Sequence, residues 1–353
     1  MKPFLAWLLL LLLLLSPCSC PAEGTDAPLG LHDAQRSVVA ALTSDEVHAL
    51  VDAMFAAAAG VTETEEIALW KTLDTPEARA SRSAANAAYR ACTLPWLLLA
   101  CAPEDAVLSD ESVACLIEVA MDAMHANPQG RAFLDDLRAL GATDSLGCMA
   151  VMQAVFQRWL AEIDPHRLSA INPDYQGWLH APGTPIDYPV VQGRDNSYYL
   201  SHLFDGTLNK AGTLFMDWRN LPGFRDPNTL IYGHHMRSDA MFHRLPRYAE
   251  PGYFDAHPFL LAVSLDAVTV VEILAAYVTD GSDPCYDIAI SDEADMRGFV
   301  TAAVEKSDFA AHVEIDCARD RLLTLSTCAY DFPGARYIVI GRLRQAGELP
   351  PCR

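Results

Sequence analysis

The residue pattern of this chain changes near position 165, and this change limits the folds that are open to it. Residues 22–165 are rich in Ala and Leu, and their apolar positions recur with the period of an amphipathic helix. Residues 166–353 contain short apolar and β-branched runs bounded by Gly, Pro and Asp. The sequence therefore predicts an all-α N-terminal region followed by a domain that contains strands.

Helical periodicity is clear in five stretches of the first region, which are 38–59, 84–101, 111–126, 130–140 and 146–163. Ser44 and Ser109 each precede acidic residues and are predicted N-caps. We therefore predict a bundle of five or six helices.

Three segments of the second region are predicted strands, namely 228–232, 321–327 and 336–343. Residues 329–335 contain Asp, Pro and Gly and are predicted to form a loop between the last two. If those two strands pair antiparallel, Cys328 at the end of one faces Arg336 at the start of the other. The remaining strand ends at Gly233 and delivers His234 to a rim.

Cysteine, histidine and arginine are the side chains that thiol acyl transfer requires. A thiol of ordinary pKa, about 8.5, is only slightly ionised at neutral pH, so a nucleophilic cysteine needs a base or cation nearby. His234 can supply that base. Attack on an amide places negative charge on the carbonyl oxygen, which a fixed guanidinium such as Arg336 can stabilise. The pattern predicts Cys328 as the nucleophile.

These residues resemble the sortase family, and specifically its class B. The resemblance rests on the run Thr324–Cys328 (Thr-Leu-Ser-Thr-Cys) and on the segment Asn228–Met236, which includes Tyr-Gly-His-His. Further matching blocks are Tyr330, 335–339, 172–174, 177–179, 182–192, 198–200 and 212–217. Together the blocks span about residues 160–345.

The resemblance implies an α+β fold, in which residues 166–353 form a mostly antiparallel, closed β-barrel with attached helices. It also implies a cysteine transpeptidase that works outside the membrane. Such an enzyme cleaves a C-terminal sorting signal of a secreted protein and holds the acyl part as a thioester. An amine of the peptidoglycan precursor then resolves the thioester. The expected partners are therefore these secreted proteins and the cell-wall amine.

The resemblance assigns a role to each motif residue. Cys328 is the expected nucleophile, His234 the proton-transfer group, and Arg336 the oxyanion or substrate clamp. The family pattern places the catalytic histidine directly after the glycine, so His235 is expected to pack or to form a hydrogen bond. Ser326 and Thr327 either contact substrate or serve only as strand residues.

Two further segments have expected roles. Residues 241–248 are expected to support His234 from behind, and residues 291–300 are predicted to form a helix beside the substrate groove, as the resemblance implies.

Two alternatives remain open for the function. One is a thiol endopeptidase that only hydrolyses its substrate, because the same three residues serve water as an acceptor. The other is an inactive sortase-like domain whose helical region acts as an envelope adaptor. Residues 22–165 are much longer than the short helical piece that class B sortases commonly carry. They are expected to be either a packing platform for the barrel or a docking module.

The N-terminus carries an export signal. Lys2 precedes an apolar run from Phe4 to Leu15, whose helix would span about 18 Å against the roughly 30 Å of a bilayer core. Residues 1–21 are therefore predicted to be a signal peptide or a membrane anchor, and the resemblance favours the anchor. Lipidation at Cys18 is a weaker alternative, because Pro17 stands where a small residue is expected. We expect the protein at the extracytoplasmic face of the cell membrane, or secreted if the leader is cleaved.

Charge and composition exclude several classes of function. The chain has 25 Lys and Arg against 46 Asp and Glu residues, so nucleic-acid binding is not expected. The sequence has neither a glycine-rich phosphate loop nor a paired-cysteine zinc pattern, so we predict no cofactor and no metal.

Ten cysteines in an exported chain raise the question of disulfides. Four lie in the helical region (Cys92, Cys101, Cys115 and Cys148), and four cysteines allow three complete pairings. Cys285, Cys317 and Cys352 lie in the same region as Cys328. Cys328 must stay reduced to act as a nucleophile.

Overall fold

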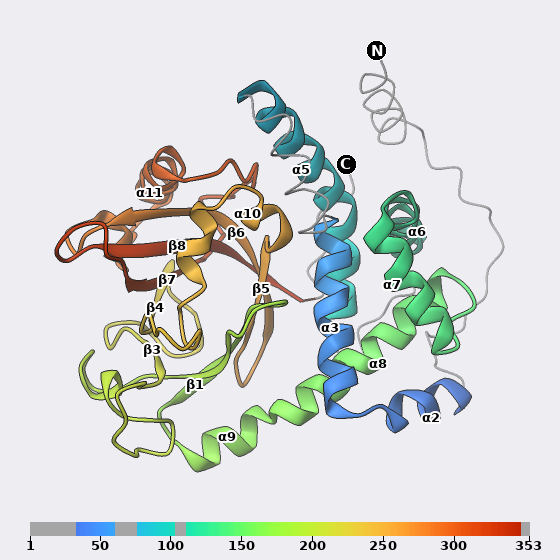
Figure 1. Cartoon of the computed structure of the whole chain (residues 1–353), viewed down its shortest axis with the longest axis horizontal. Helices are drawn as coiled ribbons and strands as arrows, with labels where there is room; N and C mark the ends of the chain where they lie inside the picture. The colour runs from blue at the N-terminus through green and yellow to red at the C-terminus, as the bar shows by residue number, and fades with distance from the viewer. Residues whose placement is uncertain (1–32, 61–75, 103–110, 347–353) are drawn as a thin grey trace.

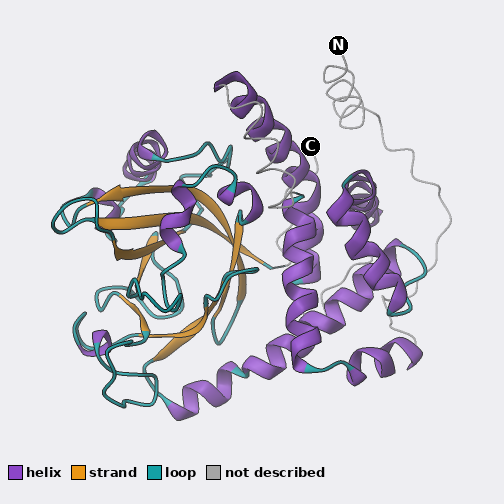
Figure 2. Ribbon diagram, viewed as in Figure 1, coloured by secondary structure: helices purple, strands orange, loops and turns teal. Residues whose placement is uncertain are grey.

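The computed structural model describes residues 33–60, 76–102 and 111–346. The N-terminal helices gather on one side of the molecule and the strands, with α10 (Tyr253–Ala256) and α11 (Glu293–Lys306), on the other, as Figures 1 and 2 show. The described helices of the N-terminal region are α2 (Asp33–Ala41), α3 (Ser44–Ala59), α5 (Pro76–Ala100), α6 (Glu111–Ala126), α7 (Pro128–Ala139) and α8 (Ser145–Ile163). The predicted all-α region is thus confirmed.

The predicted stretch 38–59 forms parts of two helices, because α2 ends at Ala41 and a new helix begins at Ser44. Thr43 has an extended backbone and is the N-cap of α3. Its side chain accepts from the Glu46 amide at 3.3 Å, and its own amide donates to the Glu46 carboxylate at 2.7 Å. This capping box needs a Glu three residues after the cap. The cap is therefore Thr43, and the prediction of Ser44 as the N-cap is wrong. The other predicted cap, Ser109, lies outside the described residues.

A short helix, α9 (Pro165–Ile171), connects the bundle to the strands and spans the predicted boundary at 165/166. Asp164 adopts a left-handed backbone with φ of 47°, which ends α8. Its side chain accepts from the Arg167 amide at 3.0 Å, and Pro165 occupies the first helical position. Asp164 therefore ends one helix and caps the next, and the chain bends there.

Eight described strands form a closed barrel in the order β1-β2-β3-β4-β7-β8-β6-β5. Their bounds are β1 (Tyr175–His180), β2 (Asp187–Val191), β3 (Leu214–Met216), β4 (Asn228–Tyr232), β5 (Phe259–Val263), β6 (Val268–Thr279), β7 (Leu322–Cys328) and β8 (Arg336–Gln345). The β2–β3 and β4–β7 pairs are parallel, and the other pairs are antiparallel. The mostly antiparallel closed barrel is confirmed, and so are the three predicted strands, each to within two residues.

The remaining described helices are part of the barrel domain and lie between its strands in the sequence. They are η1 (Tyr198–Leu200), η2 (Leu245–Ala249), α10 (Tyr253–Ala256), η3 (Pro284–Tyr286) and α11 (Glu293–Lys306). Met296 and Phe299 of α11 pack against β6, β7 and β8. The helix predicted over 291–300 begins after its N-cap Asp292, whose carboxylate accepts from two amides of the first turn.

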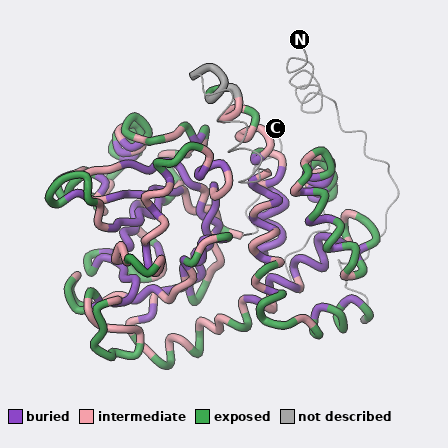
Figure 3. Tube along the Cα trace, in the orientation of Figure 1, coloured by how far each residue is buried: buried purple, intermediate pink, exposed green. Residues whose placement is uncertain are grey.

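The outer face of β5 and part of β6 join the hydrophobic core of the helical bundle. Every residue of β5 is buried, because its side chains alternate between two apolar environments. Leu260 and Ala262 face the barrel interior, whereas Leu261 and its neighbours pack with the helices. Phe55 of α3 meets Phe259 of β5 edge-on, with ring centroids 6.4 Å apart. Figure 3 shows the buried residues concentrated along α3 and in the barrel wall that faces it.

A polar cluster around a buried histidine also joins the two regions. His180 ends β1 and is 4% exposed. Its Nε2 lies 2.9 Å from Oδ1 of Asp52 in α3, and its Nδ1 lies 3.1 Å from Oδ1 of Asp187 in β2. Trp159 of α8 packs beside the ring, with centroids 5.2 Å apart. A carboxylate only accepts hydrogen bonds, so both ring nitrogens donate and His180 is an imidazolium.

Candidate active site

Cys328 and Arg336 lie opposite each other where β7 and β8 join. Cys328 is the last residue of β7, Arg336 is the first of β8, and the two are register partners. The amide of Ala329 donates to the carbonyl of Ala335 at 3.0 Å, which closes the intervening loop. The predicted antiparallel pairing is therefore confirmed. Cys328 is a half-buried free thiol.

The segment that carries His234 is bonded to the end of β7. Strand β4 runs parallel to β7 as far as the pair Tyr232 and Ser326. The Gly233 amide then donates to the Ser326 carbonyl at 3.1 Å, and the Thr327 hydroxyl donates to the Gly233 carbonyl at 2.8 Å. His234 follows immediately. The fold thus brings residues 234 and 328 to the same rim of the barrel, where β4 and β7 end.

Glycine is required before this histidine for space. A Cβ at Gly233 would lie 2.5 Å from a Leu214 side-chain carbon and 2.6 Å from one of Phe242. Any larger residue would push β4 away from these packed side chains. The close approach therefore holds the chain that leads to His234 against the barrel core.

The imidazole of His234 is oriented by a backbone carbonyl. Its Nε2 lies 2.8 Å from the carbonyl oxygen of Leu200, the last residue of η1. Because a carbonyl only accepts, Nε2 carries the proton and Nδ1 is the basic nitrogen of the neutral ring. The Phe242 amide donates to the His234 carbonyl at 3.0 Å. The segment 241–248 therefore supports His234, as expected.

His235 contacts the backbone of Cys328. Its Nδ1 lies 2.9 Å from the carbonyl oxygen of Cys328. The ring packs against Tyr330 and His243, with centroids 5.3 Å and 4.9 Å away. The expectation that His235 packs and forms a hydrogen bond is confirmed.

Arg336 is half-buried and holds the turn beside the thiol. Its guanidinium donates to the carbonyls of Gly334 at 3.2 Å and Ala335 at 3.0 Å. Burial raises the pKa of Tyr286 to about 12, and the nearby positive charge of Arg336 opposes that rise. The guanidinium therefore lies at the same end of β7 as Cys328.

The hydroxyls of Ser326 and Thr327 both have partners within the protein. Ser326 Oγ lies 2.9 Å from the hydroxyl of Tyr286, whereas Thr327 bonds to Gly233. Both residues are 2% exposed. Their side chains stabilise the strand end, and a contact to substrate stays a prediction.

Sequence reasoning missed the tyrosines behind this strand. Tyr232 stacks on Tyr286 with ring centroids 6.3 Å apart, and its hydroxyl donates to Asp217 at 2.8 Å. Burial would raise the pKa of Asp217, yet hydrogen bonds from Arg219, Tyr232 and Asn196 hold it below its ordinary value. Tyr286 is the last residue of η3 and lies 40 residues from Ser326 in the sequence, and no local pattern indicates the pairing.

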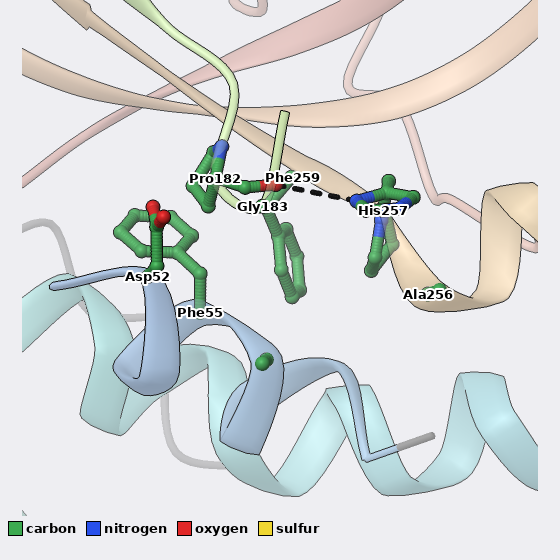
Figure 4. A pocket seen from close by; sticks show the side chains of 9 residues that line it. Asp52, Phe55, Pro182, Gly183, Ala256, His257 and Phe259 are labelled. Atoms are coloured by element: carbon green, nitrogen blue, oxygen red, sulfur yellow. Dashed lines mark hydrogen bonds between the residues drawn. The ribbon is translucent and has the colours of Figure 1, made fainter. Parts of the chain in front are cut away.

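A cavity of about 50 Å³ lies between α3 and the barrel, away from this rim. Figure 4 shows Asp52 and Phe55 of α3 opposite Pro182 and Gly183, with the Nδ1 of His257 near the Pro182 carbonyl at 3.2 Å. Cys328, His234 and Arg336 are not among its lining residues.

The seven cysteines that the structure describes are free thiols. Burial raises the pKa of Cys101 and of Cys285, so both are expected to stay protonated and inert. Cys352 lies outside the described residues, so its pairing stays open.

The sequence is similar to sortases over the barrel. The sortase domain family matches residues 179–344, so the helices α2 to α8 lie outside the match. A sortase B from Listeria monocytogenes is 34% identical over 178 residues, which is 50% of this chain and 72% of that protein. A sortase B from Staphylococcus aureus is 29% identical over 200 residues, or 54% of this chain and 82% of that one.

Solved structures agree with this likeness. A mutant form of Clostridium perfringens sortase B is 31% identical with a TM-score of 0.50, and the match covers 60% of this chain and 96% of that one. The substrate complex of Staphylococcus aureus sortase B is 27% identical with a TM-score of 0.50, covering 54% and 91%. The closed barrel and the cysteine at the end of β7 point to the same family as these relatives. The chain belongs to the class B sortases, which are cysteine transpeptidases.

Proposed function

We propose that Cys328 is the nucleophile of this transpeptidase, that His234 transfers the proton, and that Arg336 binds the carbonyl oxygen of the substrate. The register pair of Cys328 and Arg336 carries the proposal, because it puts a guanidinium beside a half-buried thiol at a strand end. The bond from Gly233 to Ser326 supports the choice of His234, since it brings that histidine to the same rim.

The reaction proceeds in two acyl transfers. The Cys328 thiol gives its proton to His234, and the resulting thiolate attacks the scissile amide carbon, so that a carbon–sulfur bond forms. The carbon–nitrogen bond then breaks, and the leaving amine takes a proton from His234. An incoming amine next attacks the thioester and gives its proton to His234, which is neutral at this stage. The carbon–sulfur bond breaks, and the thiolate returns.

Arg336 acts at the oxygen that gains charge in both steps. The guanidinium is anchored by the Gly334 and Ala335 carbonyls, so little reorganisation is needed when the oxyanion forms. Fixed donors of this kind typically contribute about a hundredfold to a thousandfold in rate.

The substrates we propose are secreted proteins with a C-terminal sorting signal, and the acceptor is an amine of the peptidoglycan precursor. Two solved sortase B structures support this assignment. One is a complex with substrate, and the other is a complex with triglycine.

We further propose that the enzyme acts at the extracytoplasmic face of the membrane, held there by residues 1–21. These residues lie outside the described part of the chain. Within residues 33–60, 76–102 and 111–346, no helix has the length and apolar character that a membrane span requires.

For residues 22–165 we propose the role of a packing platform that folds together with the barrel domain, residues 166–353. The core shared by α3 and β5 supports this role. In this view the two regions form one folding unit, and neither is an independent adaptor.

The test is mass spectrometry of residues 22–353 incubated with sorting-signal peptides, with and without an amine. We expect a thioester adduct on Cys328 that converts to an amide product when the amine is added. Cys328→Ala should form no adduct and retain the fold. Cleavage that ignores the amine would favour a hydrolase, and an active Cys328→Ala enzyme would contradict the assignment.

A further inference from the structure

The carbonyls along one edge of β7 accept hydrogen bonds from the backbone until β4 ends, and from a side chain beyond that point. The Ser326 carbonyl accepts a backbone amide, that of Gly233, at 3.1 Å. Alternate carbonyls of a strand point to the same side, so the next acceptor on this edge is the Cys328 carbonyl. It bonds to a side chain, the Nδ1 of His235, at 2.9 Å. His235 thus continues the ladder by one more bond.

We propose that His235 is a positioning residue that sets the location of the Cys328 thiol relative to His234. The proposal rests on the proposed roles of those two residues. His234 lies between Gly233 and His235, and both of these neighbours are bonded to the end of β7. With both flanks of His234 anchored, the backbone at His234 and the backbone at Cys328 cannot move apart without breaking a hydrogen bond.

Two aromatic neighbours pack against the His235 ring. His243 meets it edge-on at an interplanar angle of 69°, and Tyr330 packs at 45°. Tyr330 belongs to the loop that follows Cys328, and it is 77% exposed. The hydrogen bond joins two segments that are 93 residues apart. These neighbours contribute packing, whereas the Nδ1–H of His235 makes the link to Cys328.

Three variants separate the hydrogen bond from packing. His235→Ala removes both the ring and the donor. His235→Asn keeps a donor, because the amide nitrogen of Asn and the Nδ1 of His are both two bonds from Cβ. His243→Ala is the matched control, since it removes a ring from the same cluster and leaves the bond to Cys328.

We expect His235→Ala to lower kcat by about tenfold to a hundredfold with KM changed by less than about threefold, because small misplacements of reacting groups carry costs of this order. His235→Asn should recover most of the lost kcat, and His243→Ala should stay within about threefold of the wild type. Wild-type kcat in His235→Ala would overturn the proposal. So would an Asn variant as slow as the Ala variant, or an equal loss in His243→Ala.

Long-range ¹H–¹⁵N NMR of histidine-labelled resting enzyme tests the same bond without substrate. We expect the Nδ1 of His235 to carry a proton, and an unprotonated Nδ1 would overturn the proposal whatever the kinetics. Failure of the proposed function is recognised differently, as a wild-type enzyme that forms no thioester on Cys328. A wild-type thioester with unaffected His235 variants would refute only the positioning role.

Discussion

Stability should fall as the pH rises through the range in which His180 loses its proton. Hydrogen bonds and charges of Asp187 and Asp52 outweigh burial, which favours the neutral ring, and raise the pKa of His180 from 6.5 to about 9. A group whose pKa is raised by folding stabilises the folded state fully below its unfolded pKa. That contribution disappears as the pH passes the folded pKa.

The magnitude follows from the two pKa values. Each unit corresponds to about 1.4 kcal/mol, so a rise from 6.5 to about 9 makes about 3 kcal/mol of unfolding free energy depend on this proton. The titratable groups in contact with His180 are Asp52 and Asp187. His48 lies next to them, with its Nε2 3.9 Å from Asp187 Oδ2. Glu162 of α8 lies 3.8 Å from His48 Nδ1.

The assay is urea unfolding, under reducing conditions, at about pH 6 and about pH 10, which bracket the two pKa values. The wild type should lose about 3 kcal/mol more over this interval than His180→Gln, which has no proton to lose. The control is His166→Gln, at an exposed position of α9, and it should behave as the wild type. Equal losses in the wild type and in His180→Gln would refute the reasoning.

Three further changes have defined outcomes. Arg336→Lys should lower kcat about a hundredfold or more, because Lys lacks the planar guanidinium fork, and steady-state kinetics near wild-type values would contradict the clamp. Phe259→Ala should cost about 3–5 kcal/mol in urea unfolding, since Phe259 packs in the core shared with α3; a loss below about 1 kcal/mol would argue against that shared core. Thr43→Ala should cost about 1 kcal/mol by loss of the α3 cap, whereas Thr43→Ser should be nearly neutral.

Local patterns predicted the elements of the site well. Strand β4 was predicted at its observed bounds, and β7 and β8 were predicted to within two residues, because β-branched runs between turn residues encode backbone conformation locally. The pairing of Cys328 with Arg336 followed from the short loop between them. The Thr43 cap was missed because two hydroxyl residues are adjacent there, and only the position of Glu46 distinguishes them.

Contacts between distant segments could not be predicted in this way. Leu200 orients His234 through a backbone carbonyl, which carries no residue-specific signal. Tyr286 reaches Ser326 from the short helix η3, whose sequence indicates only a turn. The bond from His235 to the Cys328 carbonyl depends on β4 ending at a particular place along β7.

Local sequence was enough to specify the two regions, the three strands β4, β7 and β8 and the three candidate side chains, because helix period, strand alternation and turn residues act over a few positions. How the bundle meets the barrel depends instead on long-range packing. His180 and Asp52 are 128 residues apart, and Leu261 packs with helices only because β5 turns that face outward. Such contacts arise from the register of the strands and the docking of whole elements, and no short segment specifies either of these.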